Sequence, residues 1–162
     1  MTMTLTVSPL PPELAATADR TFVDGSGGTP LRCCLRDSRV GERLALVSVV
    51  PPGPVGAYAE HGPVFLHADA CPGPAVDGYP EDFRVRDQVL RAYGRNGTIV
   101  GGRVVRARSD HMAAAAELLT DPGVAFVQTR NVVHGCYMLT LTRGGNPVTG
   151  RRAAAGGRRP TR

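Results

Sequence analysis

The strongest constraint on the fold is a turn signal, Asn96-Gly97, which separates two runs of strand-forming residues. The dipeptide favours a type I′ turn because asparagine and glycine tolerate the positive φ angles that both central positions require. The twist of this turn matches the twist of two paired strands, so it suits a tight β-hairpin. The sequence therefore predicts an antiparallel hairpin formed by residues 88–95 and 98–106.

Five further runs of aliphatic and β-branched residues are typical of strands. Polar residues separate the first two, over residues 31–35 and 42–50, and predict a second hairpin. A third run, over residues 63–68, precedes a long loop rich in proline and glycine. The last two, over residues 124–130 and 136–143, alternate in polarity and predict a hairpin closed by a five-residue loop.

One stretch favours a helix of ordinary length, at residues 110–120. Ser109 or Asp110 suits the N-cap position, four alanines follow, and Asp121-Pro122-Gly123 ends the helix. A second, shorter helix is expected around residues 13–19.

About seven strands and one helix predict an α+β domain dominated by antiparallel pairing, because most consecutive strands have connections too short for a crossover. The expected shape is a curled sheet or a partly open barrel. We expect one globular domain over residues 31–143, a lead-in over residues 1–30, and a disordered arginine-rich tail over residues 144–162.

The net charge of +5 is concentrated in that tail. Residues 1–143 contain fourteen arginines and fourteen acidic residues, whereas the tail contains five arginines and no acidic residue. We therefore expect no nucleic acid on the folded body, and at most a weak, salt-sensitive contact between the tail and a polyanion.

The chain contains no lysine, which excludes two classes of protein. Pyridoxal-phosphate (PLP) enzymes need a lysine for their Schiff base, and Walker-type nucleotidases need the lysine of the P-loop. The sequence also shows neither an apolar run long enough to span a bilayer nor a basic segment followed by an apolar leader. We therefore expect a cytoplasmic protein that has no contact with membranes.

Residues 58–71 concentrate groups that can carry chemistry, among them Glu60, His67 and Cys71. If the strand in this segment buries its aliphatic face, His67 points into a cleft or into solvent. His67 is a candidate general base oriented by Glu60 or Asp69, and with Cys71 it is a candidate ligand pair for a divalent transition metal. The spacing matches no specific metal motif, and the alternative is a hydrogen-bonded strand histidine beside a surface carboxylate.

The last predicted hairpin carries a second candidate group. Its loop length makes Arg130 and Cys136 cross-strand neighbours, so the guanidinium would favour the thiolate form of Cys136. Alternatively, Arg130 binds a carboxylate or phosphate with two hydrogen bonds, or it stabilises the turn beside a buried cysteine. Arg91 and Tyr93 share a strand face that suits an anionic ligand, although the usual explanation of such a polar stripe is a solvated face of a half-exposed sheet.

Two adjacent cysteines, Cys33 and Cys34, begin a segment that is rich in charged residues. Four cysteines without a CxxC spacing do not indicate a disulfide scaffold, so each is expected to be a small buried hydrophobic residue. The nearby Glu42 is a candidate partner for a buried ion pair with an arginine of the same segment.

Four blocks of the sequence stand out together: Cys33-x-x-Arg36 with Gly41-Glu42, YAExGPxFxH at 58–67, Arg91-Ala92-Tyr93, and RNxxxGCY at 130–137. From about residue 32 to residue 143 the chain resembles DUF1203, a small bacterial family of unknown function. The resemblance implies no reaction, substrate or cofactor. Because two of its blocks coincide with the two candidate groups, it implies that these groups form one shared site.

The leading hypothesis is a small-molecule enzyme or ligand-binding domain with one polar pocket at the third strand and the last hairpin. Its catalytic residues would be Glu60, His67 and Cys136, and its metal ligands would be His67 and Cys71. A small anionic ligand would contact four residues, Arg130, Asn131, Tyr58 and Arg91. The alternatives are a non-catalytic module that forms a homodimer through a sheet edge or face, and a dedicated metal-binding protein.

Overall fold

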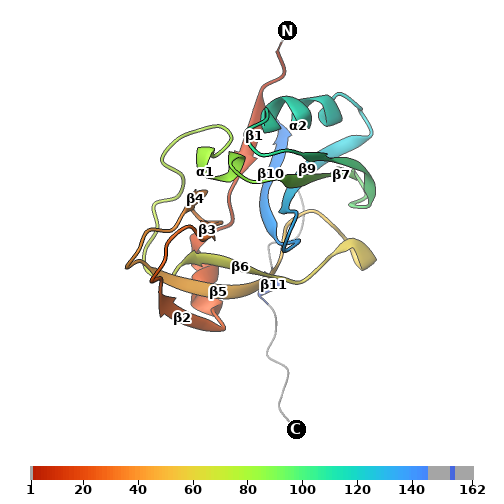
Figure 1. Cartoon of the computed structure of the whole chain (residues 1–162). Helices are drawn as coiled ribbons and strands as arrows, with labels where there is room; N and C mark the ends of the chain where they lie inside the picture. The colour runs from red at the N-terminus through yellow and green to blue at the C-terminus, as the bar shows by residue number, and fades with distance from the viewer. Residues whose placement is uncertain (1, 146–153, 156–162) are drawn as a thin grey trace.

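The computed structural model describes residues 2–145 and 154–155, which form two β-sheets (Figure 1). The first sheet has five strands in the order β1-β10-β9-β7-β8, and every pair is antiparallel. Both hairpins predicted here, β7 with β8 and β9 with β10, are confirmed. The expected type I′ turn at Asn96-Gly97 is wrong, because Gly97 has a positive φ of 77° but Asn96 does not. The strands are β1 (Leu5–Ser8), β7 (Gln88–Gly94), β8 (Ile99–Val105), β9 (Val124–Asn131) and β10 (Tyr137–Arg143).

The second sheet has six strands and is built around β5 (Arg43–Val50). One edge of β5 pairs with β6, and the other edge pairs with β2 and β11. The two-residue strands β3 and β4 lie beyond β6. The bounds are β2 (Arg20–Val23), β3 (Pro30–Leu31), β4 (Arg36–Asp37), β6 (Gly62–His67) and β11 (Ala154–Ala155).

The predicted hairpin between residues 31–35 and 42–50 is wrong. β3 ends at Leu31 and pairs in parallel with β6, while β5 pairs with β2 and β6. The residues after β3 form a turn in which the Leu35 N–H donates to the Leu31 carbonyl at 2.9 Å. Leu35 has a φ of 56°, in the left-handed region, and this conformation ends the extended chain.

The predicted helix is confirmed as α2 (His111–Leu119), with Asp110 as its N-cap. The Asp110 carboxylate accepts the Ala113 N–H at 2.9 Å. Buried residues of α2 pack against the first sheet. Three short helical segments connect strands, and the first lies where the shorter helix was expected: η1 (Pro12–Thr17), η2 (Gly56–Tyr58) and α1 (Glu81–Arg84).

The predicted fold class, mostly antiparallel β-structure with one ordinary helix, is confirmed. The expectation of seven strands is too low, and neither sheet closes into a barrel within the described residues. Several strands that the sequence pattern missed have two or four residues, which is too few to show alternating polarity. Two of them, β1 and β2, come from residues 1–30 and pair with β10 and β5.

Each sheet has its own hydrophobic core. The first core lies between the five-stranded sheet and α2, and it includes Leu90 and Leu139. The second surrounds β5 and β6 and includes Leu66 together with Cys33 and Cys34, so these two cysteines are buried as expected.

Most of the predicted tail lies outside the described residues, because it includes residues 146–153 and 156–162. Among the helices of the described chain, none combines the length and the apolar character that crossing a membrane requires.

Candidate metal centre

Four side chains with metal-ligating atoms converge where the turn after β3 meets the end of β6. Cys33 and Cys34 lie in that turn, His67 is the last residue of β6, and Cys71 follows in the next loop. The parallel pairing of β3 with β6 fixes this arrangement, and it includes a 3.0 Å hydrogen bond from the Arg32 N–H to β6. Segments distant in sequence therefore meet at one point.

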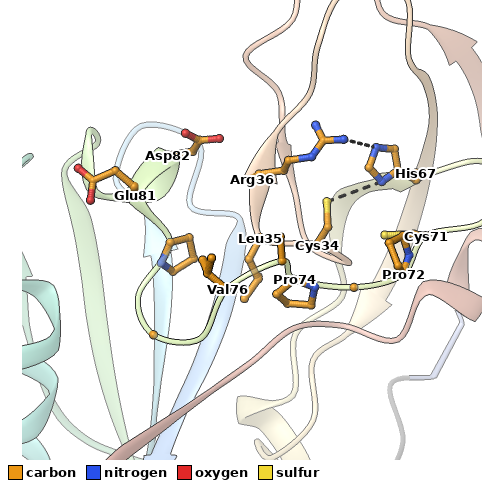
Figure 2. Close-up of a pocket in the computed structure, with 14 residues that line it drawn as sticks. Cys34, Leu35, Arg36, His67, Cys71, Pro72, Pro74, Val76, Glu81 and Asp82 are labelled. Atoms are coloured by element: carbon orange, nitrogen blue, oxygen red, sulfur yellow. Dashed lines mark hydrogen bonds between the residues drawn. The ribbon is translucent and has the colours of Figure 1, made fainter.

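The four ligand atoms lie within 4.8 Å of one another. The Nδ1 atom of His67 is 3.7 Å from the Sγ atom of Cys33 and 3.6 Å from that of Cys34. Figure 2 shows the His67 ring directed at Cys34, with Cys71 beside it. Cys33 and Cys34 are buried, whereas His67 and Cys71 are half-buried. The group could hold a metal ion, and it contains both predicted ligands, His67 and Cys71.

A carboxylate supports the other nitrogen of the His67 ring, because Glu42 Oε1 lies 3.3 Å from Nε2. Arg36 holds this carboxylate with two hydrogen bonds, from Nη2 to Oε1 at 2.6 Å and from Nη1 to Oε2 at 3.0 Å. Arg36 Nη2 also lies 3.2 Å from His67 Nε2 (Figure 2). The arginine that pairs with Glu42 is therefore Arg36, and both side chains are half-buried.

The three thiols of the cluster differ in acidity. A hydrogen bond from Cys33 lowers the pKa of Cys34, and the positive charge of Arg36 contributes in the same direction. The same cysteine contact, together with burial, raises the pKa of Cys33, and burial raises the pKa of Cys71. Cys34 is therefore the cysteine of the cluster whose thiolate form the surroundings favour most.

The cluster borders a pocket of about 310 Å³. Cys34, Arg36, His67 and Cys71 form one wall (Figure 2). The proline-rich loop 72–76, which begins beside Cys71, and the first residues of α1 line the rest of the pocket. A small molecule in this pocket could contact both the thiols and the guanidinium group.

The ion pair of Glu42 with Arg36 makes the stability of the fold depend on pH. The hydrogen bonds from Arg36 lower the pKa of Glu42 from 4.5 to about 2. A carboxylate with a lowered folded-state pKa stabilises the fold above its unfolded-state pKa, and this contribution disappears as the pH falls through the folded-state value. We therefore expect Glu42→Gln to be less stable than the wild type near neutral pH, with the difference shrinking between pH 4.5 and about 2. Urea unfolding at a series of pH values measures this, and a difference that does not change with pH would contradict it.

Several of the other predicted residues, Glu60, Arg91, Arg130 and Cys136, lie near the opposite end of β6. Glu60 Oε2 lies 3.2 Å from Arg130 Nη1, and Glu60 Oε1 lies 3.0 Å from Arg91 Nη1. Glu60, Arg130 and Cys136 line a second recess of about 160 Å³. Because the six residues of β6 extend about 17 Å, the predicted residues are divided between two sites rather than gathered in one pocket. The catalytic roles of Glu60, His67 and Cys136 stay predictions.

The register of the last hairpin differs from the prediction by one residue. Arg130 pairs with Tyr137, whereas Asn131 continues β9 and donates its N–H to the Cys136 carbonyl at 2.9 Å. The side-chain oxygen of Asn131 accepts two N–H groups of the loop, at 2.9 and 3.2 Å, so this residue caps the turn. Tyr58, the fourth predicted ligand contact, is 39% exposed and lines neither pocket.

Cys33, Cys34 and Glu42 were expected to have structural rather than chemical roles. Metal motifs are recognised by close spacing of ligands, whereas Cys34 and His67 are separated by 33 positions. The available signal was the first block of the family resemblance, which combines Cys33, Arg36 and Glu42.

Comparison with known proteins gives a family but no activity. Residues 28–143 match a family model described as a protein of unknown function (DUF1203). No curated protein and no solved structure matches the chain. The matched region includes all four residues of the Cys/His cluster.

Proposed function

The chain belongs to the DUF1203 family, and because that family has no assigned activity, we propose from the geometry of the site that it binds one zinc ion. The ligands are Cys33, Cys34, His67 and Cys71. Thiolate and imidazole are the donors that favour zinc, whereas magnesium and calcium prefer oxygen ligands.

The sulfur-to-nitrogen distances carry this proposal. A tetrahedral zinc ion with bonds of about 2.3 Å to sulfur and 2.05 Å to nitrogen separates the two donor atoms by about 3.6 Å. The Nδ1 atom of His67 lies 3.7 Å from Cys33 Sγ and 3.6 Å from Cys34 Sγ. The described side chains therefore have the spacing of two edges of a zinc tetrahedron.

The surroundings of His67 also suit a metal ligand. Coordination through Nδ1 requires the proton to be on Nε2, where Glu42 Oε1 can accept it across 3.3 Å. Carboxylates commonly orient metal-binding histidines in this way and increase their basicity. The two hydrogen bonds from Arg36 fix that carboxylate in place.

Four protein ligands fill the tetrahedral shell, which is the pattern of structural zinc sites. The ion would connect the turn after β3, the end of β6 and the loop that begins at Ala68. Zinc would thus hold together three segments of the second sheet, and its removal would loosen that region.

Titration with Co²⁺ tests the proposal. Tetrahedral cobalt bound to thiolates gives strong visible d–d bands and a sulfur-to-metal charge-transfer band, so we expect both bands to saturate at one equivalent per chain. Zinc should then displace cobalt and abolish the bands, because zinc is the preferred ion. Elemental analysis of the protein as purified should give one zinc per chain.

The remaining cysteine provides a matched control. Cys136 lies in the last hairpin, outside the cluster, so Cys136→Ser should bind cobalt like the wild type, whereas Cys71→Ser should change the charge-transfer band. Absence of cobalt uptake by the wild-type protein, or equal changes in the two variants, would contradict the proposal.

Thiol chemistry on a small molecule is the second candidate function. It is favoured by the position of Cys34, which has a lowered pKa and faces the 310 Å³ pocket beside Arg36. Alkylation by iodoacetamide distinguishes the candidates. Selective labelling of Cys34 in zinc-loaded protein would favour thiol chemistry, whereas protection by zinc would favour the metal site.

A further inference from the structure

Arg130 carries a buried positive charge that the protein satisfies only in part. Its side chain is 7% exposed, and Nη1 donates to the Gly135 carbonyl at 3.2 Å and lies 3.2 Å from Glu60 Oε2. The Nε and Nη2 atoms are buried and have no hydrogen-bond acceptor among the described residues. A buried guanidinium with unmatched donors is costly, so this arrangement favours a further acceptor at Arg130.

Glu60 is shared between two arginines. Its Oε1 atom pairs with Arg91 at 3.0 Å, while its Oε2 atom pairs with Arg130. Arg91 pairs with Gln128 across the sheet, and Gln128 and Arg130 share one face of β9, so both guanidinium groups lie on that face. Glu60 itself is 46% exposed and belongs to no helix or strand, so it can turn into solvent.

The charges around this recess do not balance. Arg32 is 3% exposed, donates from Nε to the Tyr137 carbonyl at 2.7 Å, and forms no ion pair within the described chain. Tyr137 lines the recess, so Arg32 lies next to its wall. Arg91 and Arg130 contribute two positive charges against the single negative charge of Glu60, which leaves an excess of one, and the buried charge of Arg32 behind the wall adds to it.

We propose that the recess beside Arg130 binds a small dianionic oxyanion, the phosphate group of a small molecule or inorganic phosphate. Arg130 lines the recess, and Arg91 lies just outside its lining and reaches it through the shared partner Glu60. The recess has a volume of about 160 Å³, which is too small for a drug-sized ligand but suits a single ionic group. A phosphate group carries a charge of about −1.5 to −2 at neutral pH and accepts paired hydrogen bonds from guanidinium groups. It therefore matches the charge excess better than a monocarboxylate does.

Glu60 acts as the internal competitor of this ligand. Its carboxylate occupies the two guanidinium groups in the absence of the anion, and it turns outward when the anion binds. His61 and His134, both exposed, also line the recess. The site is independent of the proposed zinc centre, because the two lie at opposite ends of β6.

Calorimetric titration with inorganic phosphate at constant ionic strength tests the inference. We expect Glu60→Gln to bind phosphate about tenfold more tightly than the wild type, because the neutral amide no longer competes for the guanidinium groups. A tenfold change in affinity corresponds to about 1.4 kcal/mol of binding free energy. We expect Arg91→Gln to bind at least about tenfold more weakly, because one guanidinium group is lost. Acetate, with one charge, should bind more weakly than phosphate to every one of these proteins.

Arg103→Gln is the matched control. Arg103 pairs with Glu117 on the surface, so the variant has the same net charge as Arg91→Gln but an intact recess. Its phosphate affinity should equal that of the wild type. Equal affinities of Arg91→Gln and Arg103→Gln, or no gain in Glu60→Gln, would overturn the inference. Because Glu60 is partly exposed, Glu60→Gln is informative even where an arginine variant is unstable.

Discussion

Replacing Cys34 by serine is expected to weaken zinc binding by about a hundredfold or more. Structural zinc sites with four ligands contribute about 10–16 kcal/mol, or about 3 kcal/mol for each ligand. Since each 1.4 kcal/mol is about a tenfold change in affinity, the loss of one thiolate ligand corresponds to at least about a hundredfold. Competition with a chromophoric chelator measures the affinity of each variant.

Two comparisons make this result specific to the proposed site. Glu42→Gln removes the carboxylate beside His67 Nε2, and loss of such a supporting group typically costs about 10–100-fold in metal affinity. Cys136→Ser should bind zinc like the wild type, because Cys136 is not part of the cluster. The prediction fails if Cys136→Ser loses as much affinity as Cys34→Ser.

Replacing Gly53 by alanine is expected to destabilise the folded protein by about 2–6 kcal/mol, from backbone strain and overpacking together. Gly53 has a φ of +116°, a conformation that side chains disfavour, and an added methyl group would overlap with the ring of Phe126. That ring cannot move aside easily, because it is buried and stacked on Tyr93 with ring centroids 4.9 Å apart. The backbone cannot shift freely either, since the neighbouring Pro52 carbonyl accepts a 3.0 Å hydrogen bond from Gln128.

Gly28→Ala separates the two contributions to this effect. Gly28 has a φ of +80°, but an added methyl group would meet no atom within 4 Å. Its expected cost is therefore the backbone strain alone, about 1–3 kcal/mol. Urea unfolding of both variants gives the free energies of unfolding, and equal losses would show that contact with Phe126 costs little.

The elements that could be predicted from the sequence have strong local signals. Asn96-Gly97 predicted the pairing of β7 with β8, although not the type of its turn, and Asp110 with the alanines after it predicted the start of α2. The pairing of β3 with β6 has no such signal, because β3 contains two residues and its partner lies more than thirty positions away. The left-handed turn at Leu35 also ended a stretch, Leu31–Leu35, that was expected to be one strand.

The candidate metal centre could be predicted from the sequence only in part. The chemical types of His67 and Cys71 identified them as candidate metal ligands without help from the fold. Cys33 and Cys34 have the composition of buried hydrophobic residues, and only the long-range pairing of β3 brings them to His67. The two candidate groups looked like one because Glu60 and His67 are close in sequence, but an extended strand keeps its two ends apart.

Because β3 pairs in parallel with β6, Cys33 and Cys71 meet although 38 positions separate them along the chain (71 minus 33). An ion bound by both would close this stretch into a ring and reduce the conformational freedom of the unfolded chain, as a disulfide does. For a ring of about 40 residues, the chain-entropy relation gives a stabilisation of about 4 kcal/mol. Unlike a disulfide, this ring opens when zinc is removed. The free energy of unfolding would therefore increase with the concentration of free zinc.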